Sequence, residues 1–64
     1  MTETHHPAPS AIKAAREAAG LTQSAAAALL YKTTRAWQWW EAGEREMDPA
    51  LWELFLIKTR STAS

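Results

Sequence analysis

Apolar residues in this chain gather in four short groups, separated from one another by polar residues, glycine or proline. The groups are rich in good helix formers such as Ala and Leu. No stretch of useful length alternates apolar and polar residues as a half-buried strand would, and the sequence contains no Val. The pattern predicts an all-α fold of four short helices, at residues 11–19, 23–30, 34 or 35 to about 41, and 49–58.

Residues that start and stop helices stand at the ends of these groups. The N-caps, whose side-chain oxygens accept hydrogen bonds from free N–H groups of the first turn, are expected at Ser10, Thr22, either Thr33 or Thr34, and Asp48. Gly20 and Gly43 are placed as stop signals. The chain therefore divides into a flexible tail at residues 1–9, a helical domain at 10–59 and a frayed end at 60–64.

The second and third predicted helices carry the main functional signal. The second contains the run Ala25 to Ala28, and only about three residues connect it to the third. Small side chains let two helices approach closely, and a short connection forces a steep crossing. A helix-turn-helix has this geometry, and its second helix can lie in a DNA major groove. Any small helical bundle can also use alanine at close contacts, so the feature is not specific by itself.

The order of the residues is more specific. The motif residues are Leu21-Thr22-Gln23, Ala27, Leu30, Thr33, Trp40-Glu41 and Gly43-Glu44-Arg45. This pattern, which runs without a gap from about Ile12 to Pro49, resembles the Cro/C1-type (XRE family) helix-turn-helix repressors. The segment from Trp37 to Arg45, followed by Met47 and the stretch from Leu51 to Phe55, looks like a small branch of that family from phages and mobile elements. The resemblance implies a compact, lambda-repressor-like four-helix DNA-binding domain.

The resemblance also implies roles for particular side chains. It places Gln23 on a DNA phosphate, and Thr33, Thr34 and Arg35 at base edges. Residues one turn further along the third helix, and the basic residue before it, complete the candidate DNA-binding set: Gln38, Trp39 and Lys32. Chemistry supports base reading by Arg35 and Gln38, because an Arg side chain can bind guanine, and a Gln side chain adenine, through two hydrogen bonds each.

The resemblance further implies a bridge between Arg16 and Glu41, which would tie the first helix to the end of the third. The alternative is two solvated surface charges. The sequence departs from the family at Tyr31, where a glycine is common. Because a Tyr at positive φ is strained, we expect a wider turn or a longer second helix there, with Lys32 directed outward.

Composition and charge restrict the other possibilities. The 64 residues carry seven basic and seven acidic side chains, so the chain is neutral, although residues 10–40 have a surplus of three positive charges. There is no cysteine, His5 and His6 are adjacent in the tail, and no serine has a positioned base. We therefore expect no enzyme, no metal, no cofactor and no small-molecule ligand. With no membrane-spanning apolar run and no signal segment, we expect a cytoplasmic protein with no membrane partner.

Aromatic and aliphatic residues of the third and fourth helices predict the core and an interface. Trp37 and Trp40 are three residues apart on one helix face and are assigned to the core. The fourth helix is apolar almost all round, and a chain this short has little left to cover its second face. We therefore predict a homodimer whose interface contains Trp52, Phe55 and Leu56.

These features lead to two functional hypotheses. The first is a sequence-specific double-stranded DNA-binding transcriptional regulator, a dimeric repressor that occludes a promoter by reading a palindromic operator through the helix starting near Thr33. The alternative is a protein-interaction module, antitoxin-like or a regulatory subunit, that keeps the helix-turn-helix scaffold with weak DNA binding. The acidic residues around Arg45 favour this alternative.

Overall fold

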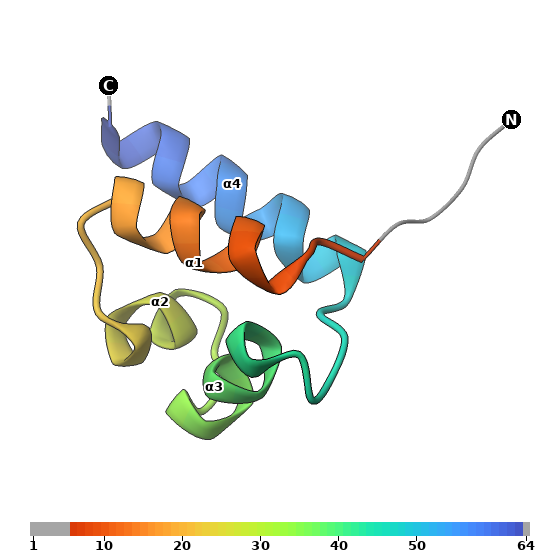
Figure 1. The fold of residues 1–64 in the computed structure, drawn as a ribbon. Coiled ribbons are helices and arrows are strands. Elements are labelled where there is room, and N and C mark those ends of the chain that lie inside the picture. Colours follow the sequence, from red (N-terminus) through yellow and green to blue (C-terminus); the bar gives the residue numbers. More distant parts are fainter. Residues whose placement is uncertain (1–5, 64) are drawn as a thin grey trace, which may run out of the picture.

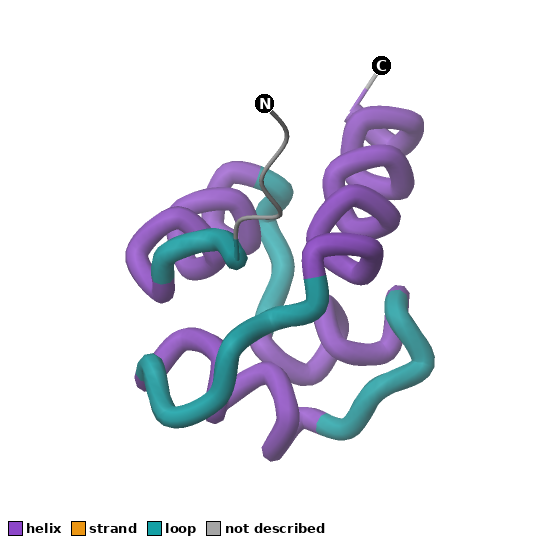
Figure 2. The backbone as a smooth tube through the Cα atoms, turned by 90° about the vertical axis from the view of Figure 1, so that its right-hand side faces the viewer, coloured by secondary structure: helices purple, strands orange, loops and turns teal. Residues whose placement is uncertain are grey.

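Four α-helices and their connections form the fold, which a computed structural model describes for residues 6–63, with side chains through residue 60. The helices are α1 (Pro9–Ala18), α2 (Gln23–Leu29), α3 (Thr34–Ala42) and α4 (Pro49–Ala63). The part of the chain described contains no strand, as the sequence predicts. In two perpendicular views α1 and α4 lie above α2 and α3 (Figures 1 and 2). None of the described helices combines the length and the apolar character needed to cross a membrane.

Aromatic rings and small side chains fill the core together. Trp37 packs edge-on against Trp40 at 5.5 Å between ring centroids, and against Phe55 of α4 at 5.0 Å. Ala26 and Ala27 are fully buried, so the alanine run does allow α2 to pack closely, as predicted. The whole buried set is Ile12, Ala26, Ala27, Leu30, Trp37, Trp40, Met47 and Phe55. The assignment of Trp37 and Trp40 to the core is confirmed.

The predicted helix starts are correct for three of the four helices. Thr22 accepts a hydrogen bond from the backbone N–H of Ala25, Thr33 accepts one from Ala36, and Asp48 accepts one from Ala50. The prediction for Ser10 is wrong, because α1 begins at Pro9 with Ala8 as its N-cap. Proline suits a first helical position, since its φ is already helical and it lacks the N–H that would stay unpaired there.

Three helices end in the same hydrogen-bonded motif, and one of them does so without glycine. At α1 and α3 the left-handed residue is Gly20 or Gly43, whereas at α2 it is Tyr31, with φ of 59°. The N–H of Lys32 bonds to the carbonyl of Ala27 and that of Tyr31 to the carbonyl of Ala28, the pairing of a Schellman motif. The expected wider turn or longer second helix is therefore wrong. Lys32 is exposed, as predicted.

Helix α4 is longer than predicted and buries a residue assigned to the dimer interface. It continues to Ala63, beyond the predicted end at residue 58, because no glycine or proline stops it. Thr59 fits into the helix by donating its hydroxyl to the carbonyl of Phe55 at 2.8 Å. Phe55 is fully buried within one copy, so its assignment to a dimer interface is wrong. Trp52 and Leu56 are half-buried.

The expected tail at residues 1–9 lies partly outside the described residues, as does the end of the chain at Ser64. Of the two tail histidines, only His6 is described. Its Nδ1 lies 3.0 Å from the carbonyl oxygen of Met47, and its Nε2 lies 3.0 Å from a carboxylate oxygen of Glu46. The N-terminal segment thus meets the connection between α3 and α4 at His6.

Candidate nucleic-acid interface

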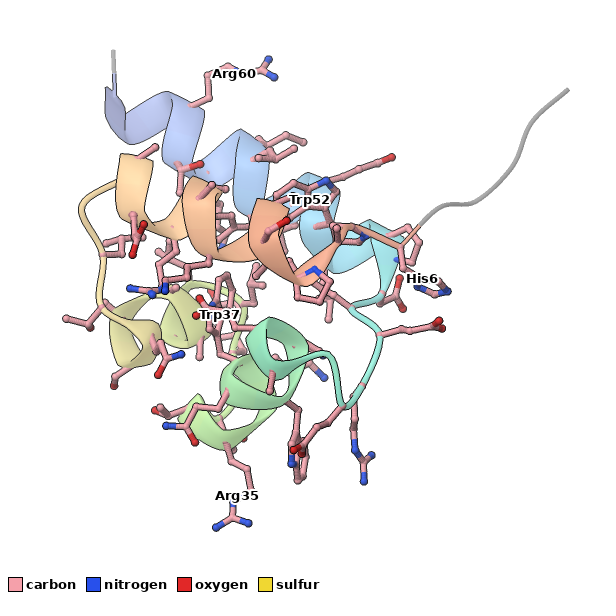
Figure 3. All side chains as sticks on the ribbon, in the orientation of Figure 1. His6, Arg35, Trp37, Trp52 and Arg60 are labelled. Carbon is pink, nitrogen blue, oxygen red and sulfur yellow. The ribbon has the colours of Figure 1, made fainter. Side chains whose placement is uncertain are left out.

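The exposed side of α3 contains most of the residues that the sequence assigns to DNA binding. Trp37 points from α3 into the core, toward Phe55 of α4. With about 3.6 residues per turn, positions two residues before and after Trp37 lie on the opposite side of the helix. Arg35 and Trp39 occupy these positions, and Figure 3 shows Arg35 projecting from the molecule while Trp37 points inward. The face therefore looks away from α4.

Polar and aromatic side chains line this side of α3. We call Thr34, Arg35, Gln38 and Trp39 the α3 face. Arg35 and Gln38 are exposed, and Thr34 and Trp39 are half-exposed. The preceding turn adds Lys32 and Thr33, both exposed, at the helix N-terminus. The oxygen of Thr33 is already used as the N-cap of α3. The structure thus brings six of the seven candidate residues together in one continuous segment.

Gln23, the seventh candidate, makes a structural contact that the sequence does not predict. It is half-buried, and its amide nitrogen donates to Oε1 of Glu41 over 3.0 Å. Its position at the start of α2 explains this contact, because the first turn of α2 packs beside the end of α3. Gln23 therefore links these two helices through Glu41.

The carboxylate of Glu41 is the centre of a polar cluster that holds α3 in place. Arg16 reaches it from α1, with Nε at 2.6 Å from Oε2 and Nη2 at 3.3 Å from Oε1. Trp37 donates its indole N–H to Oε2 over 2.5 Å. Arg16 also donates to the carbonyl of Leu21 over 2.9 Å. The cluster fixes the orientation of α3 relative to both preceding helices, and the Arg16–Glu41 bridge implied by the resemblance is present.

Burial and hydrogen bonding act in opposite directions on Glu41. Its side chain is 9% exposed, and this burial raises the pKa of the carboxyl group. Hydrogen bonds from Arg16, Trp37 and Gln23 stabilise the carboxylate and outweigh the burial, so the pKa of Glu41 lies below its ordinary value. The hydrogen bond to Glu41 likewise raises the pKa of Arg16. Both groups are charged across the physiological range.

Sequence reasoning missed Arg45, which the structure brings to the α3 face. Its guanidinium carbon lies 4.2 Å from the centroid of the Trp39 ring, a cation–π contact. The left-handed conformation at Gly43 reverses the chain after α3 and returns Arg45 to the preceding turn. In the sequence, Gly43 is the signal for this reversal. The neighbours Glu44 and Glu46 make the loop acidic, which hides the role of Arg45.

Sequence reasoning also missed Lys58, for which the chain offers no local signal. Its Nζ donates to the carbonyl of Leu29 over 2.6 Å and lies 4.7 Å from the Tyr31 ring centroid. A cation is favourable at this position, because the last carbonyls of a helix have no partner within the helix. Lys58 therefore ties α4 to the end of α2, just before the turn that leads into α3.

Comparison with known proteins finds no family model that matches the chain and no curated protein with significant similarity to it.

Proposed function

We propose that this chain is a sequence-specific double-stranded DNA-binding regulator, in which α2, the following turn and α3 act as a helix-turn-helix of the lambda-repressor-like type. The observation that carries the proposal is the exposed α3 face, where Arg35 and Gln38 project beside Trp39. Arginine and glutamine are the side chains that read guanine and adenine in the major groove. In this proposal Arg35 and Gln38 read bases.

Basic and polar groups around the α3 face supply the phosphate contacts. Lys32 and Arg45 are exposed on either side of α3 and provide positive charge. The N-terminus of α3 adds a partial positive charge next to Thr34. Trp39, with Arg45 packed on its ring, offers an apolar surface to thymine methyl groups or to a sugar. A regulator of this kind acts as a cytoplasmic repressor by occluding a promoter, without catalysis or cofactor.

The hydrogen bonds that hold α3 against α1 and α2 support this function. Base reading needs side chains fixed relative to the groove, and three hydrogen bonds to the Glu41 carboxylate connect α3 to α1 and α2. The Arg16–Glu41 pair at the centre of this polar cluster is largely removed from solvent, with the side chains 13% and 9% exposed. The helix that carries the exposed side chains of α3 is therefore held in a fixed position relative to α1 and α2.

Selection from a pool of randomised duplexes tests the proposal. The protein is expected to enrich one sequence, and its affinity for that duplex is expected to fall with salt, with a log–log slope of about −2 per copy for the phosphate contacts of Lys32 and Arg45. Arg35→Ala is expected to remove the preference at one base position. Lys13→Ala, which removes an equal charge from α1, is the matched control and should leave the preference intact. Failure to enrich any sequence would contradict the proposal.

One observation favours the alternative protein-interaction module. Glu44, Glu46 and Asp48 are exposed in the connection that follows α3, close to Arg45, and acidic groups there oppose a DNA backbone. An interaction module would bind the randomised duplexes weakly, with a shallow salt dependence and no enriched sequence. The same selection experiment therefore separates the two functions.

A further inference from the structure

Helix α4 exposes a stripe of three side chains on the side that faces away from the core. Glu53, Ile57 and Arg60 are spaced by four and three residues, so they lie along one side of the helix. All three are exposed. Ile57, with 56% exposure, is one of two large hydrophobic residues that are exposed to solvent among the described side chains. Phe55, on the opposite side of α4, is fully buried. We call Glu53, Ile57 and Arg60 the outer stripe.

The outer stripe is complementary to itself when two copies run antiparallel. Its acidic and basic ends are seven residues apart, two helical turns, with Ile57 between them. A two-fold axis near Ile57 places Glu53 of one copy beside Arg60 of the second copy, and symmetry repeats the pair at the other end. Neither side chain has an ion-pair partner among the described residues. The charges thus favour a second copy of this chain over a partner of uniform charge.

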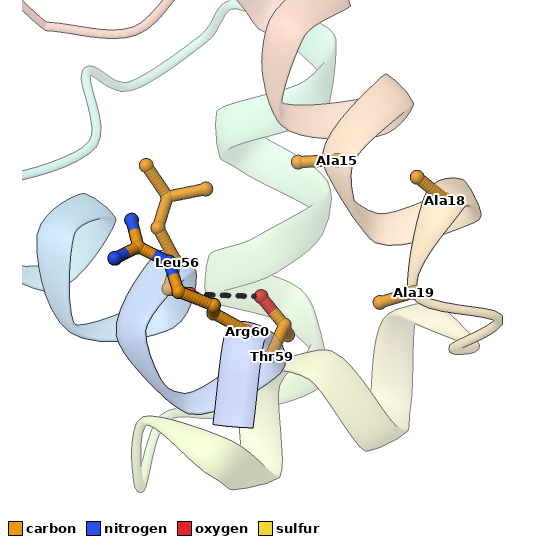
Figure 4. Close-up of a pocket in the computed structure, with 6 residues that line it drawn as sticks. All are labelled: Ala15, Ala18, Ala19, Leu56, Thr59 and Arg60. Carbon is orange, nitrogen blue, oxygen red and sulfur yellow. Dashed lines mark hydrogen bonds between the residues drawn. The ribbon is translucent and has the colours of Figure 1, made fainter. Parts of the chain in front are cut away.

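A shallow hollow next to the outer stripe extends the apolar surface. It has a volume of about 330 Å³ and lies between α1 and α4. Its lining consists of Ala15, Ala18, Ala19, Leu56, Thr59 and Arg60, as Figure 4 shows. Small alanine side chains on one wall leave room for an aliphatic side chain from a second copy. Arg60 belongs to both the hollow and the stripe, so the two features form one surface.

The outer stripe lies on the opposite end of the molecule from the α3 face. Phe55 on α4 and Trp37 on α3 point toward each other, so the stripe and the α3 face point away from each other. Figure 3 shows Arg60 and Arg35 at these two ends. A two-fold axis in a contact surface reverses the direction normal to that surface. Two copies joined at their outer stripes therefore direct their α3 faces in opposite directions.

We propose that a second copy of this chain docks antiparallel on the outer stripe, and that the resulting dimer holds two separate duplex segments, one at each end. The DNA part of this inference rests on the proposed function. It differs from the palindromic operator expected from the sequence, in which both α3 helices meet one face of a single duplex. A dimer of this kind brings two DNA sites together.

A charge exchange tests the interface by sedimentation equilibrium. Glu53→Arg alone, or Arg60→Glu alone, turns two attractive pairs into two repulsive ones and is expected to weaken dimerisation by about tenfold. The double variant Glu53→Arg/Arg60→Glu restores opposite charges and should return the dimerisation constant toward that of the original chain. Ile57→Lys puts two cations at the centre and should give a monomer with an unchanged helical CD spectrum. A monomeric original chain at millimolar concentration, or a double variant as weak as the single ones, overturns the interface.

A bridging assay tests the orientation of the two copies. Beads carry the duplex that the protein selects from the randomised pool, and the same duplex with a fluorescent label is added in solution. The original chain should retain labelled duplex on the beads, and Ile57→Lys should bind each duplex singly without retaining it. Retention that is equal for both proteins, or a dimer that protects two half-sites on one duplex, overturns the orientation. If no duplex is selected, the proposed function fails, while the charge exchange still decides the interface.

Discussion

Arg16 and Glu41 are 25 residues apart in the chain and meet side by side, with two N–H groups of the guanidinium donating to the two oxygens of the carboxylate. The pair is almost removed from solvent and receives further hydrogen bonds from Trp37 and Gln23. The pair joins α1 to α3, and the Gln23 hydrogen bond joins α2 to the same carboxylate. Removal of the pair should therefore affect stability before it affects binding.

Arg16→Ala is expected to cost roughly 3–5 kcal/mol of unfolding free energy, because it leaves the Glu41 carboxylate buried without its cation. For a domain of this size such a loss is enough to unfold much of the population at room temperature. Thermal unfolding followed by CD measures it. Lys13→Ala, on the exposed side of the same helix, should change the stability by less than about 0.5 kcal/mol. Equal melting temperatures for both variants would show that the bridge contributes nothing.

Acid should destabilise the chain through Glu41. The pKa of Glu41 is lower in the folded chain than its ordinary value of 4.5, so the folded state holds the charged form more strongly than the unfolded state does. The resulting stability is fully present above pH 4.5 and is lost as the pH falls through the lower folded pKa. Urea unfolding from neutral pH to about pH 3 measures the loss. Glu41→Gln should be less stable at neutral pH and should lose less on acidification, whereas exposed Glu44→Gln should follow the original chain.

Trp37 and Trp40 should respond differently to replacement by Phe. Both rings are buried in the same core, so each substitution loses similar packing. Trp37→Phe also removes the N–H that donates to Glu41, which adds about 1–3 kcal/mol to its cost because the acceptor is charged and buried. Chemical denaturation of both variants gives the comparison. Equal losses would indicate that the indole hydrogen bond adds no stability.

Tyr31 stores backbone strain that glycine would relieve. Its φ of 59° lies in the left-handed region, which is unfavourable for a residue with a Cβ atom. Tyr31→Gly should be more stable than Tyr31→Ala by about 1 kcal/mol, since both lose the ring contact with Lys58 and only glycine relieves the strain. Thermal unfolding of this matched pair isolates the backbone effect. If the alanine variant is as stable as the glycine variant, the conformation at this position carries no strain.

Arg35 and Arg45 should have different effects on DNA binding, which fluorescence anisotropy with selected and altered duplexes can separate. Arg35→Ala is expected to cost about 1–3 kcal/mol on the selected duplex and to relax the preference at one position. Arg45→Ala should weaken binding to all duplexes similarly and reduce the salt slope by about 1, because it removes a phosphate contact. A uniform loss from Arg35→Ala would mean that Arg35 binds phosphate and does not read a base.

Local signals in the sequence predicted most of the helix boundaries. Thr22, Thr33 and Asp48 cap helices as expected, because an N-cap hydrogen bond involves residues only two or three positions apart. The prediction of Ser10 as an N-cap is wrong because Pro9 is a competing start signal one residue earlier. The end of α4 was missed because a helix without a stop signal can continue as long as its backbone hydrogen bonds form.

The sequence by itself determined the all-helical architecture, the burial of Trp37 and Trp40, and the pairing of Arg16 with Glu41 through a family resemblance. The tertiary structure alone decided that Gln23 and Trp37 share the Glu41 carboxylate, that Arg45 packs on Trp39, and that Phe55 is core while Ile57 is exposed. The physical reason is the range of the interactions. Caps and helix periodicity depend on residues within one or two turns, whereas the side of an apolar helix that becomes the core depends on where the other helices lie.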